Sequence, residues 1–418
     1  MSALQKKLLL SIALLLVLQT GINLARYFSE VTDFGGDFFG FWQAAQRVRQ
    51  GDIPAIYDPD AWRNLLSVGT PDNLYWFVYP PFALFGLWPF GHMTYNEAVL
   101  VWSLAPLPFY FGLMILLAKR SDLGRETKLA GQNPASPVQA HAVLLAMALP
   151  LLSANLFSGQ TGTFVAVFFL GAAYFWRRHS ILAGICIGLL AVKPQMGLLL
   201  PFALAAAGQW RTIAAAAATI AVLVAAATAW LGTAIWFDYL HMTQVFGNFI
   251  GQGFSGIRQL ALSPYVSLQA VGVHAGFAAM LQAGIALTAL VTIIFVFWRN
   301  AVNRAGDDEM LDLRLALLIT GTLLATPYAL SYDTPVLILA ILPLIARAWR
   351  EGWDALELAA VTALVVLPYA QPIFVKIHVP FGFCALLLSF CVLYRRYRRD
   401  ATVSEVRVSM SHSGVSGQ

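Results

Sequence analysis

The sequence predicts an all-α, polytopic integral membrane protein. Of its 418 residues, 59% are hydrophobic and 11% are charged, whereas soluble domains carry about 25% charged residues. Apolar runs of roughly 15 to 23 residues recur between short polar breaks, and a bilayer-spanning helix needs about 20 such residues. Lipid offers no partner for free backbone groups, so these runs should be helical. The runs lack the period-two alternation that is typical of a transmembrane barrel.

The apolar runs predict about 12 or 13 transmembrane helices. The first run extends from Leu8 to about Ala25 and follows two lysines. Because no small-residue cleavage site comes after it, we expect an uncleaved span with a cytoplasmic N-terminus. The segment from Tyr75 to Phe90 is short for a span and contains three prolines. It crosses the membrane, dips in and returns, or lies on the surface.

Lysine and arginine concentrate in alternate breaks between the apolar runs. These basic breaks contain Lys119, Arg120, Arg125, Lys128, Arg177, Arg178, Arg211, Arg299, Arg304, Arg347, Arg350, Arg395, Arg396, Arg398 and Arg399. Basic residues favour cytoplasmic loops, so we expect both termini in the cytoplasm and a location in the plasma (bacterial inner) membrane. The net charge of +5 is explained by the basic residues of these cytoplasmic loops. Because the basic residues are scattered through loops, we expect no nucleic-acid partner.

The expected domain organisation is simple. Residues 1–395 form one transmembrane domain, in which residues 27–74 are the first outer loop. Residues 396–418 are basic and then rich in Ser, Gly and Val, which predicts a disordered cytoplasmic tail. No cytoplasmic break exceeds about 20 residues, which is too short for a separate soluble domain such as one that binds nucleotides.

The first outer loop is rich in aspartate. Its stretch from Gly35 to Gly51 combines aromatic and polar residues at helical spacing, which predicts a short amphipathic helix at the membrane interface. Asp33 and Asp37 lie four positions apart and would share one face if that helix begins early enough. Asp is a preferred N-cap residue, so one of the two either caps the helix or takes part in chemistry.

Lys193 lies in the apolar stretch LLAVKPQMGLLL, immediately before Pro194. An ionisable side chain at membrane depth is costly and tends to face a cavity or a partner. The proline stops the preceding helix and frees carbonyl groups, which indicates irregular backbone lining a cavity. Lys193 either snorkels to the interface or provides a cation for a phosphate.

Three further polar residues lie in breaks between apolar runs. Asp333 follows Tyr332, and its carboxylate either caps the next helix or belongs to a site. Gln160 lies in NLFSGQTG (Asn155 to Gly162), where a tight turn between two spans explains the sequence adequately. Arg258 lies in a later outer break and is most simply a solvated loop residue. Motifs typical of phosphate-binding loops, zinc proteases and nucleophile elbows are absent from the sequence.

Taken together, these segments resemble the polyprenol-phosphate-mannose-dependent mannosyltransferase-like enzymes of glycosyltransferase family 87, which have the GT-C fold. The resemblance runs from about Asp33 to Asp333. The segments that carry it are GGDFFGFWQAAQRVRQGDIPAIYDP (Gly35 to Pro59), YPPFALFGLWPF (Tyr79 to Phe90), SGQTG (Ser158 to Gly162), AGICIGLLAVKPQ (Ala183 to Gln195) and TPYALSYD (Thr326 to Asp333). Each is short, and their order and spacing give the resemblance its specificity.

The resemblance implies a hexosyltransferase that moves a mannose-like sugar from a polyprenyl-phosphate donor to an acceptor hydroxyl. The active site would face the periplasmic or extracellular side, with membrane lipids around it and a lipid, glycan or protein-linked glycan as acceptor. Asp37 occupies the position of the family's general base, with Asp33 as the alternate, and a single displacement would invert the anomeric centre.

Further site residues follow from this mechanism. Lys193 and Arg258 would stabilise the departing phosphate. Gln160, Tyr332 and Asp333 would contact the sugar or the acceptor. The resemblance implies neither a metal nor a cofactor.

Two other functions fit a chain with many spans. A transporter or flippase for a lipid-linked sugar would also place charges inside the membrane, but such proteins often consist of two repeated halves, and no repeat is visible in this sequence. A surface-polysaccharide polymerase or ligase typically concentrates Arg and His in a large outer loop, whereas aspartates dominate the first outer loop of this chain.

Overall fold

The protein is described by a computed structural model for residues 36–66, 76–121, 123, 137–251, 259–303 and 308–413, together with Leu18 and Gly21. Within these residues the secondary structure is helical and contains no strand, which confirms the predicted all-α class. The elements are α2 (Phe38–Gln50), η1 (Pro54–Tyr57), α3 (Pro59–Leu66), α4 (Ala83–Leu87), η2 (Trp88–His92), α5 (Tyr95–Leu104), α6 (Leu107–Arg120), α7 (Pro137–Ser158), α8 (Gly162–Phe175), α9 (Ser180–Leu189), η3 (Leu190–Val192), η4 (Pro194–Gly197), α10 (Leu200–Ala206), α11 (Trp210–Leu231), α12 (Ala234–Gly251), α14 (Pro264–Ala270), α15 (Ala275–Asn303), α16 (Asp308–Ala325), η5 (Ser331–Leu337), α17 (Ile338–Glu351), α18 (Ala355–Phe374), η6 (Val375–Ile377) and α19 (Phe381–Ser413).

Six helical segments of the described residues are long and apolar enough to cross a membrane. They are Tyr95–Arg120, Val138–Ser158, Trp210–Leu231, Ala275–Trp298, Ser331–Glu351 and Ala355–Ile377. Shorter apolar helices lie at Gly162–Phe175, Ser180–Val192 and Pro194–Ala206. Helices able to span a membrane are thus confirmed, whereas the predicted total of about 12 stays a prediction. Of the first predicted span, only Leu18 and Gly21 lie within the described residues.

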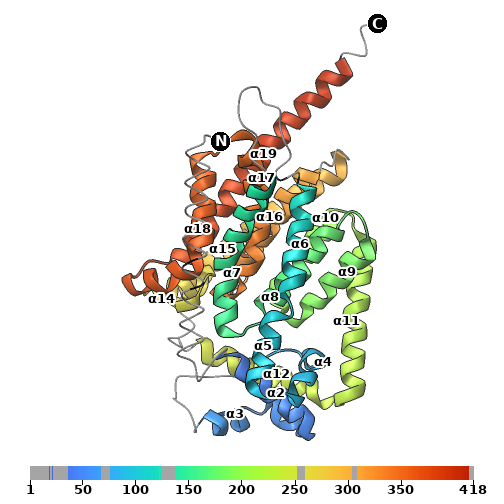
Figure 1. The fold of residues 1–418 in the computed structure, drawn as a ribbon, viewed down its shortest axis with the longest axis vertical. Helices are drawn as coiled ribbons and strands as arrows, with labels where there is room; N and C mark the ends of the chain where they lie inside the picture. Colours follow the sequence, from blue (N-terminus) through green and yellow to red (C-terminus); the bar gives the residue numbers. More distant parts are fainter. Residues whose placement is uncertain are drawn as a thin grey trace.

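The long helices form a bundle (Figure 1). One of its ends holds a set of ion pairs. At this end, which we call the basic end, Arg120 of α6 pairs with Asp312 of α16. Arg347 of α17 contacts Asp400 of α19 at 2.8 Å. These basic residues belong to the breaks that the charge alternation assigns to one side of the membrane.

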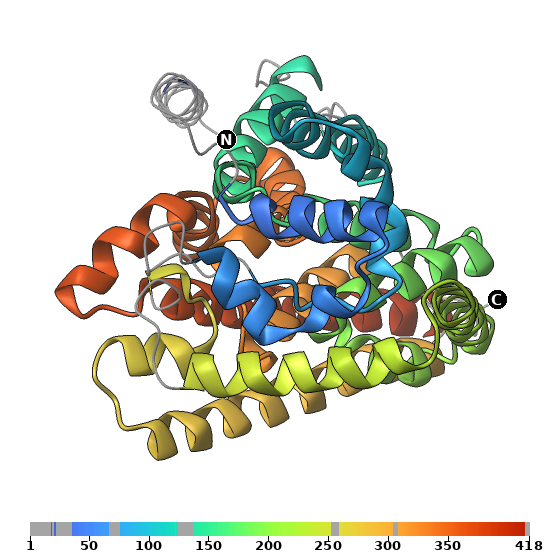
Figure 2. The ribbon, with the colours of Figure 1, turned by 90° about the horizontal axis from the view of Figure 1, so that it is seen from below.

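The opposite end, which we call the site end, is covered by short helices. Seen from below, α2 and α12 lie across the view while α11 is seen end-on (Figure 2). The segment from Tyr75 to Phe90 belongs to this layer as far as it is described: it is extended to Pro80, then forms α4 and η2, and both pack against α2. A Cβ on Gly91 would lie 2.5 Å from the carbonyl oxygen of Ala45, so η2 approaches the backbone of α2 closely. The described part of this segment lies across the end of the bundle. Among the three placements that the sequence left open, this arrangement agrees with a segment on the surface.

The helices on either side of Lys193 form a hairpin that enters and leaves at the basic end. Gly184 of α9 lies against Thr212 of α11, and Gly188 lies against Thr219, so α9 and α11 run in the same direction. The chain must therefore return through α10 before α11 begins. At about 1.5 Å per residue each arm is about 20 Å long, shorter than the hydrocarbon core of a bilayer at about 30 Å. Lys193 is at the tip of this hairpin.

The predicted amphipathic helix is present as α2, one residue after Asp37. Its apolar face packs on an aromatic cluster that includes Phe77 and Trp102. Arg47, one of the polar residues of this amphipathic stretch, is buried. Its guanidinium donates to the carbonyl oxygen of Ala55 and stacks 4.7 Å from the ring centroid of Trp62. The helix is covered by η1 and α3, and its placement at a membrane interface stays a prediction.

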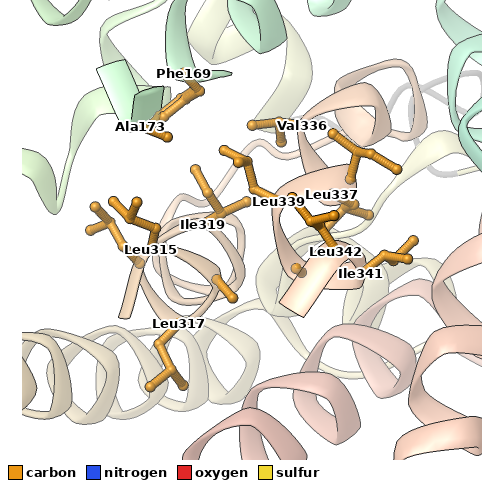
Figure 3. Close-up of a cluster of buried hydrophobic side chains, with 14 of the residues drawn as sticks. Phe169, Ala173, Leu315, Leu317, Ile319, Val336, Leu337, Leu339, Ile341 and Leu342 are labelled. Atoms are coloured by element: carbon orange, nitrogen blue, oxygen red, sulfur yellow. The ribbon is translucent and has the colours of Figure 1, made fainter. Parts of the chain in front are cut away.

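The segment formed by η5 and α17 runs through the centre of the bundle. In the apolar window of Ser331–Glu351, 94% of residues are buried, against 17% in Trp210–Leu231, so the former is the central span and the latter is peripheral. Figure 3 shows Phe169 of α8 and Ile319 of α16 beside Val336 and Leu339 of this segment. Close packing of these apolar side chains fixes the position of the residues that precede them in η5.

The C-terminal segment differs from the predicted disordered tail. Helix α19 continues to Ser413, and the last five residues, 414–418, lie outside the described part. Arg396 is tied to Glu357 of α18 at 3.2 Å and to Asp400, one turn further along α19, at 3.1 Å. These pairs attach the start of the tail to the bundle and extend the helix beyond the apolar residues.

Candidate active site

Asp37 is the first residue of the site. It occupies the N-cap position of α2, but its side chain makes no capping hydrogen bond. Its backbone N–H donates to the carbonyl oxygen of Ser158 at 3.0 Å, which fixes the start of α2 on the end of α7. Its carboxylate accepts a hydrogen bond from the side chain of Gln160, at 2.9 Å between Nε2 and Oδ2. The capping alternative is therefore not met, and the carboxylate points to another element.

Gln160 lies in the turn between α7 and α8. Gly159 has a φ of 66°, a left-handed conformation that favours glycine, and its carbonyl oxygen accepts a hydrogen bond from Trp102 Nε1 at 2.9 Å. The turn is as tight as the sequence suggests. The turn also does more than connect α7 and α8, because the side-chain amide of Gln160 forms hydrogen bonds to both Asp37 and Tyr79.

Tyr79 lies in the extended segment that precedes α4. Its phenol oxygen is 3.0 Å from Gln160 Oε1 and 3.0 Å from Thr161 Oγ1. The ring packs edge-on against Phe41 of α2, with centroids 5.0 Å apart. Tyr79 therefore contacts both the aromatic cluster beneath α2 and the polar groups of the site.

Lys193 and Asp333 form the charged pair of the site. The Nζ atom of Lys193 donates to Oδ1 of Asp333, and it also lies 4.6 Å from the ring centroid of Tyr332. The second carboxylate oxygen of Asp333 accepts from the backbone N–H of Leu330 at 3.2 Å. Both charged side chains are buried, so Lys193 does not snorkel to the surface. The carboxylate of Asp333 therefore caps the start of η5 with one oxygen and pairs with Lys193 through the other.

The turn that carries Gln160 touches the segment that carries Asp333. A Cβ on Gly162 would lie 1.9 Å from the carbonyl oxygen of Tyr332, so only glycine allows this approach. Buried Asn155 adds two hydrogen bonds, donating from Nδ2 to the same carbonyl at 3.3 Å and accepting from Thr163 Oγ1 at 2.7 Å. These contacts fix the turn between α7 and α8 against the start of η5.

The electrostatics of the site suit a proton acceptor. Burial raises the pKa of the Asp37 carboxyl above its ordinary value, while the Gln160 hydrogen bond and the charge of Lys193 act in the opposite direction. A carboxylate with a raised pKa holds an abstracted proton more strongly, which is what a general base near neutral pH requires. Asp37 is also partly exposed, so a substrate hydroxyl can reach it.

A family model for glycosyltransferase family 87 matches residues 77–327, which is more than half of the chain. The chain belongs to glycosyltransferase family 87. No curated protein and no solved structure matches it. Family membership and the apolar helices together make it a membrane glycosyltransferase. Gln160 and Lys193 lie inside the matched residues of this family 87 chain, whereas Asp37 and Asp333 lie outside them.

The structure brings most of the expected site residues of this glycosyltransferase together. Those that meet are Asp37, Gln160, Lys193, Tyr332 and Asp333. Asp33 and Arg258 lie outside the described residues. In the described part of the chain, no group of three or more His, Cys, Asp or Glu side chains could hold a metal ion.

Sequence reasoning missed Tyr79 and Asn155. Tyr79 stands in a proline-rich segment whose placement the sequence left open. Asn155 looks like one polar residue near the end of a span. The sequence does contain one indication of this part of the site: polar residues are concentrated at the α7–α8 turn, where Asn155, Gln160 and Thr161 follow a long apolar run.

Proposed function

We propose that this family 87 enzyme transfers a hexose from a polyprenyl-phosphate-linked donor to an acceptor hydroxyl at the site end of the bundle. The observation that carries the proposal is the Asp37 carboxylate, which is partly exposed, free of capping duty and held by Gln160 at 2.9 Å. Asp37 takes the proton of the acceptor hydroxyl as its oxygen attacks the anomeric carbon. The bond from that carbon to the donor phosphate breaks, and the anomeric centre inverts.

The build of the chain supports this donor class. The described residues are helices of the bundle and its end layer, and they hold no fold of strands and helices that would bind a soluble nucleotide sugar. A polyprenyl phosphate is both lipid anchor and leaving group, so it delivers the sugar from within the bilayer. With the positive-inside rule, the basic end is cytoplasmic and the site end faces outward.

Lys193 has the capacity to contact the departing phosphate. An ammonium group has three N–H donors, and among the described residues Lys193 gives one hydrogen bond, to Asp333. The remaining donors are available to a phosphate oxygen. Charge stabilisation of this kind gains strength where water is excluded. Arg258 would assist from the neighbouring segment, and Asp333 and Tyr332 would contact the sugar.

The test uses purified full-length protein in lipid nanodiscs with a panel of polyprenyl-phosphate hexoses and candidate acceptors. We expect at least one donor to yield free polyprenyl phosphate and a glycosylated acceptor. Asp37→Asn keeps an acceptor oxygen for Gln160 but removes the base, so turnover should fall by roughly 10² to 10⁴. The control is Asp52→Asn, which changes an exposed aspartate at the same end and should keep full activity. Normal turnover of Asp37→Asn would exclude Asp37 as the base.

A further inference from the structure

We propose that Tyr79 is a positioning residue that keeps the amide nitrogen of Gln160 directed at Asp37. The inference rests on the proposed role of Asp37 as the base. It concerns the orientation of one side-chain amide, whose two ends offer opposite hydrogen-bonding groups. Tyr79 decides which of those ends the carboxylate meets.

The contacts around Gln160 form one directed chain. Its Nε2 lies 2.9 Å from Asp37 Oδ2, and its Oε1 lies 3.0 Å from the phenol oxygen of Tyr79. An amide oxygen only accepts, so Tyr79 must donate to it. The phenol oxygen then accepts from the hydroxyl of Thr161 at 3.0 Å. Every group in this arrangement has a partner of the opposite kind.

A reversed amide would break this chain. The nitrogen of Gln160 would then donate to Tyr79, and the phenol would have to donate to Thr161. The hydroxyl proton of Thr161, a buried residue, has no other side-chain acceptor among the described residues. A buried donor without an acceptor is costly, so the chain favours the observed direction. Burial raises the pKa of Tyr79, and the phenol therefore remains a donor through the neutral range.

The ring of Tyr79 is held in place independently of its hydroxyl. It packs against Phe41 and lies 5.9 Å from the ring centroid of Phe77. Its backbone carbonyl accepts from the hydroxyl of Tyr57 at 2.6 Å. Tyr79→Phe therefore keeps the packing and removes only the phenol hydrogen bonds.

The orientation of the amide favours the charged form of Asp37. An N–H directed at the carboxylate stabilises the anion, whereas a protonated Asp37 would need an acceptor in that place. The other charged group that acts on Asp37 is Lys193, whose positive charge favours the anion. The phenol of Tyr332 lies close enough to Asp37 for an electrostatic interaction. The carboxylate of Asp333 is paired with Lys193. Without the Tyr79 hydroxyl the amide of Gln160 can rotate and accept from a protonated Asp37.

The experiment is the pH profile of kcat/KM for the full-length enzyme with the donor and acceptor found active. Loss of activity on the acid side reports protonation of the base. We expect this acid limb to move upward by about half a pH unit in Tyr79→Phe and by about one unit in Gln160→Leu. Tyr397→Phe is the matched control, because it removes the hydroxyl of another buried tyrosine, which donates to the carbonyl oxygen of Val296 at the basic end and does not touch Tyr79. Its acid limb should stay at the wild-type position.

The outcomes separate this inference from the proposed function. An unmoved acid limb in Tyr79→Phe, with only a lower kcat, would make the tyrosine a packing residue and overturn the inference. An unmoved limb in Gln160→Leu would do so as well, because no route from Tyr79 to the base would remain. Undiminished activity of Asp37→Asn would instead overturn the proposed base, whatever the tyrosine variants show.

Discussion

Lys193 and Asp333 form a buried ion pair across 140 residues of sequence, joining the tip of the α9–α10 hairpin to the start of η5. Lys193 lies between η3 and η4, and Asp333 lies in the first turn of η5. The pair therefore fixes where the hairpin ends relative to the central span. It also places a positive charge near Asp37, where it favours the anion.

The first prediction concerns this pair. Removing one member leaves the other charge buried and uncompensated, which costs about 3–5 kcal/mol. We expect Asp333→Asn and Lys193→Met each to lower the thermal unfolding midpoint in detergent more than the double variant does. Equal or greater loss in the double variant would show that the two charges do not compensate each other. Donor dependence of the residual transfer activity then reports whether Lys193 also binds the phosphate.

A second prediction concerns the contact between Gly162 and Tyr332. A methyl group at Gly162 would lie 1.9 Å from a backbone oxygen, so α8 and η5 must separate in Gly162→Ala. We expect a loss of about 1–3 kcal/mol in stability and a larger fractional loss of kcat than of donor binding. Gly247→Ala in α12 is the control, because open space surrounds that position. If both variants behave alike, the close approach does not matter to the site.

A third prediction concerns the attachment of α19. Arg396 is buried and contacts Glu351, Glu357 and Asp400, whereas Arg395 next to it is 57% exposed and, among the described residues, pairs with Asp354 alone. Arg396→Met leaves the buried carboxylate of Glu357 without its cation and should cost about 3 kcal/mol. Arg395→Met removes an exposed pair and should cost less than about 1 kcal/mol. Chemical denaturation monitored by tryptophan fluorescence distinguishes the two, and similar values would contradict the assigned burial.

The sequence predicted the class of fold and several members of the site because those features are local. A long apolar run gives a helix in lipid wherever it packs. Asp37 stands directly before an amphipathic stretch, and the resemblance to family 87 distinguished it from a helix cap. Residue pairing is different: Asp37 meets Gln160 across 123 positions, and hydrophobic periodicity carries no information on such a contact. The burial of Arg47 was missed for the same reason, because its partners come from η1 and α3.

The hairpin at Lys193 shows where span counting fails. Its two arms are apolar and helical, so by composition they count as two spans, yet each is only about 20 Å long, shorter than the hydrocarbon core of a bilayer. A hairpin that returns to its own side leaves the sidedness of all later helices unchanged. The charge alternation survives for this reason, since the breaks at Arg178 and Arg211 lie on the same side of the bundle.

The last prediction tests that sidedness with exposed positions from the two ends. Thr233 lies between α11 and α12 at the site end, and His179 precedes α9 at the basic end; both are exposed. In a background with Cys186, Cys384 and Cys391 replaced by serine, we expect Thr233→Cys to react with an impermeant maleimide added to intact cells. His179→Cys should react only after the membrane is opened, because basic loops remain in the cytoplasm. Labelling of both from outside would place the hairpin entrance and the site end on one side, which a bundle of this length does not allow.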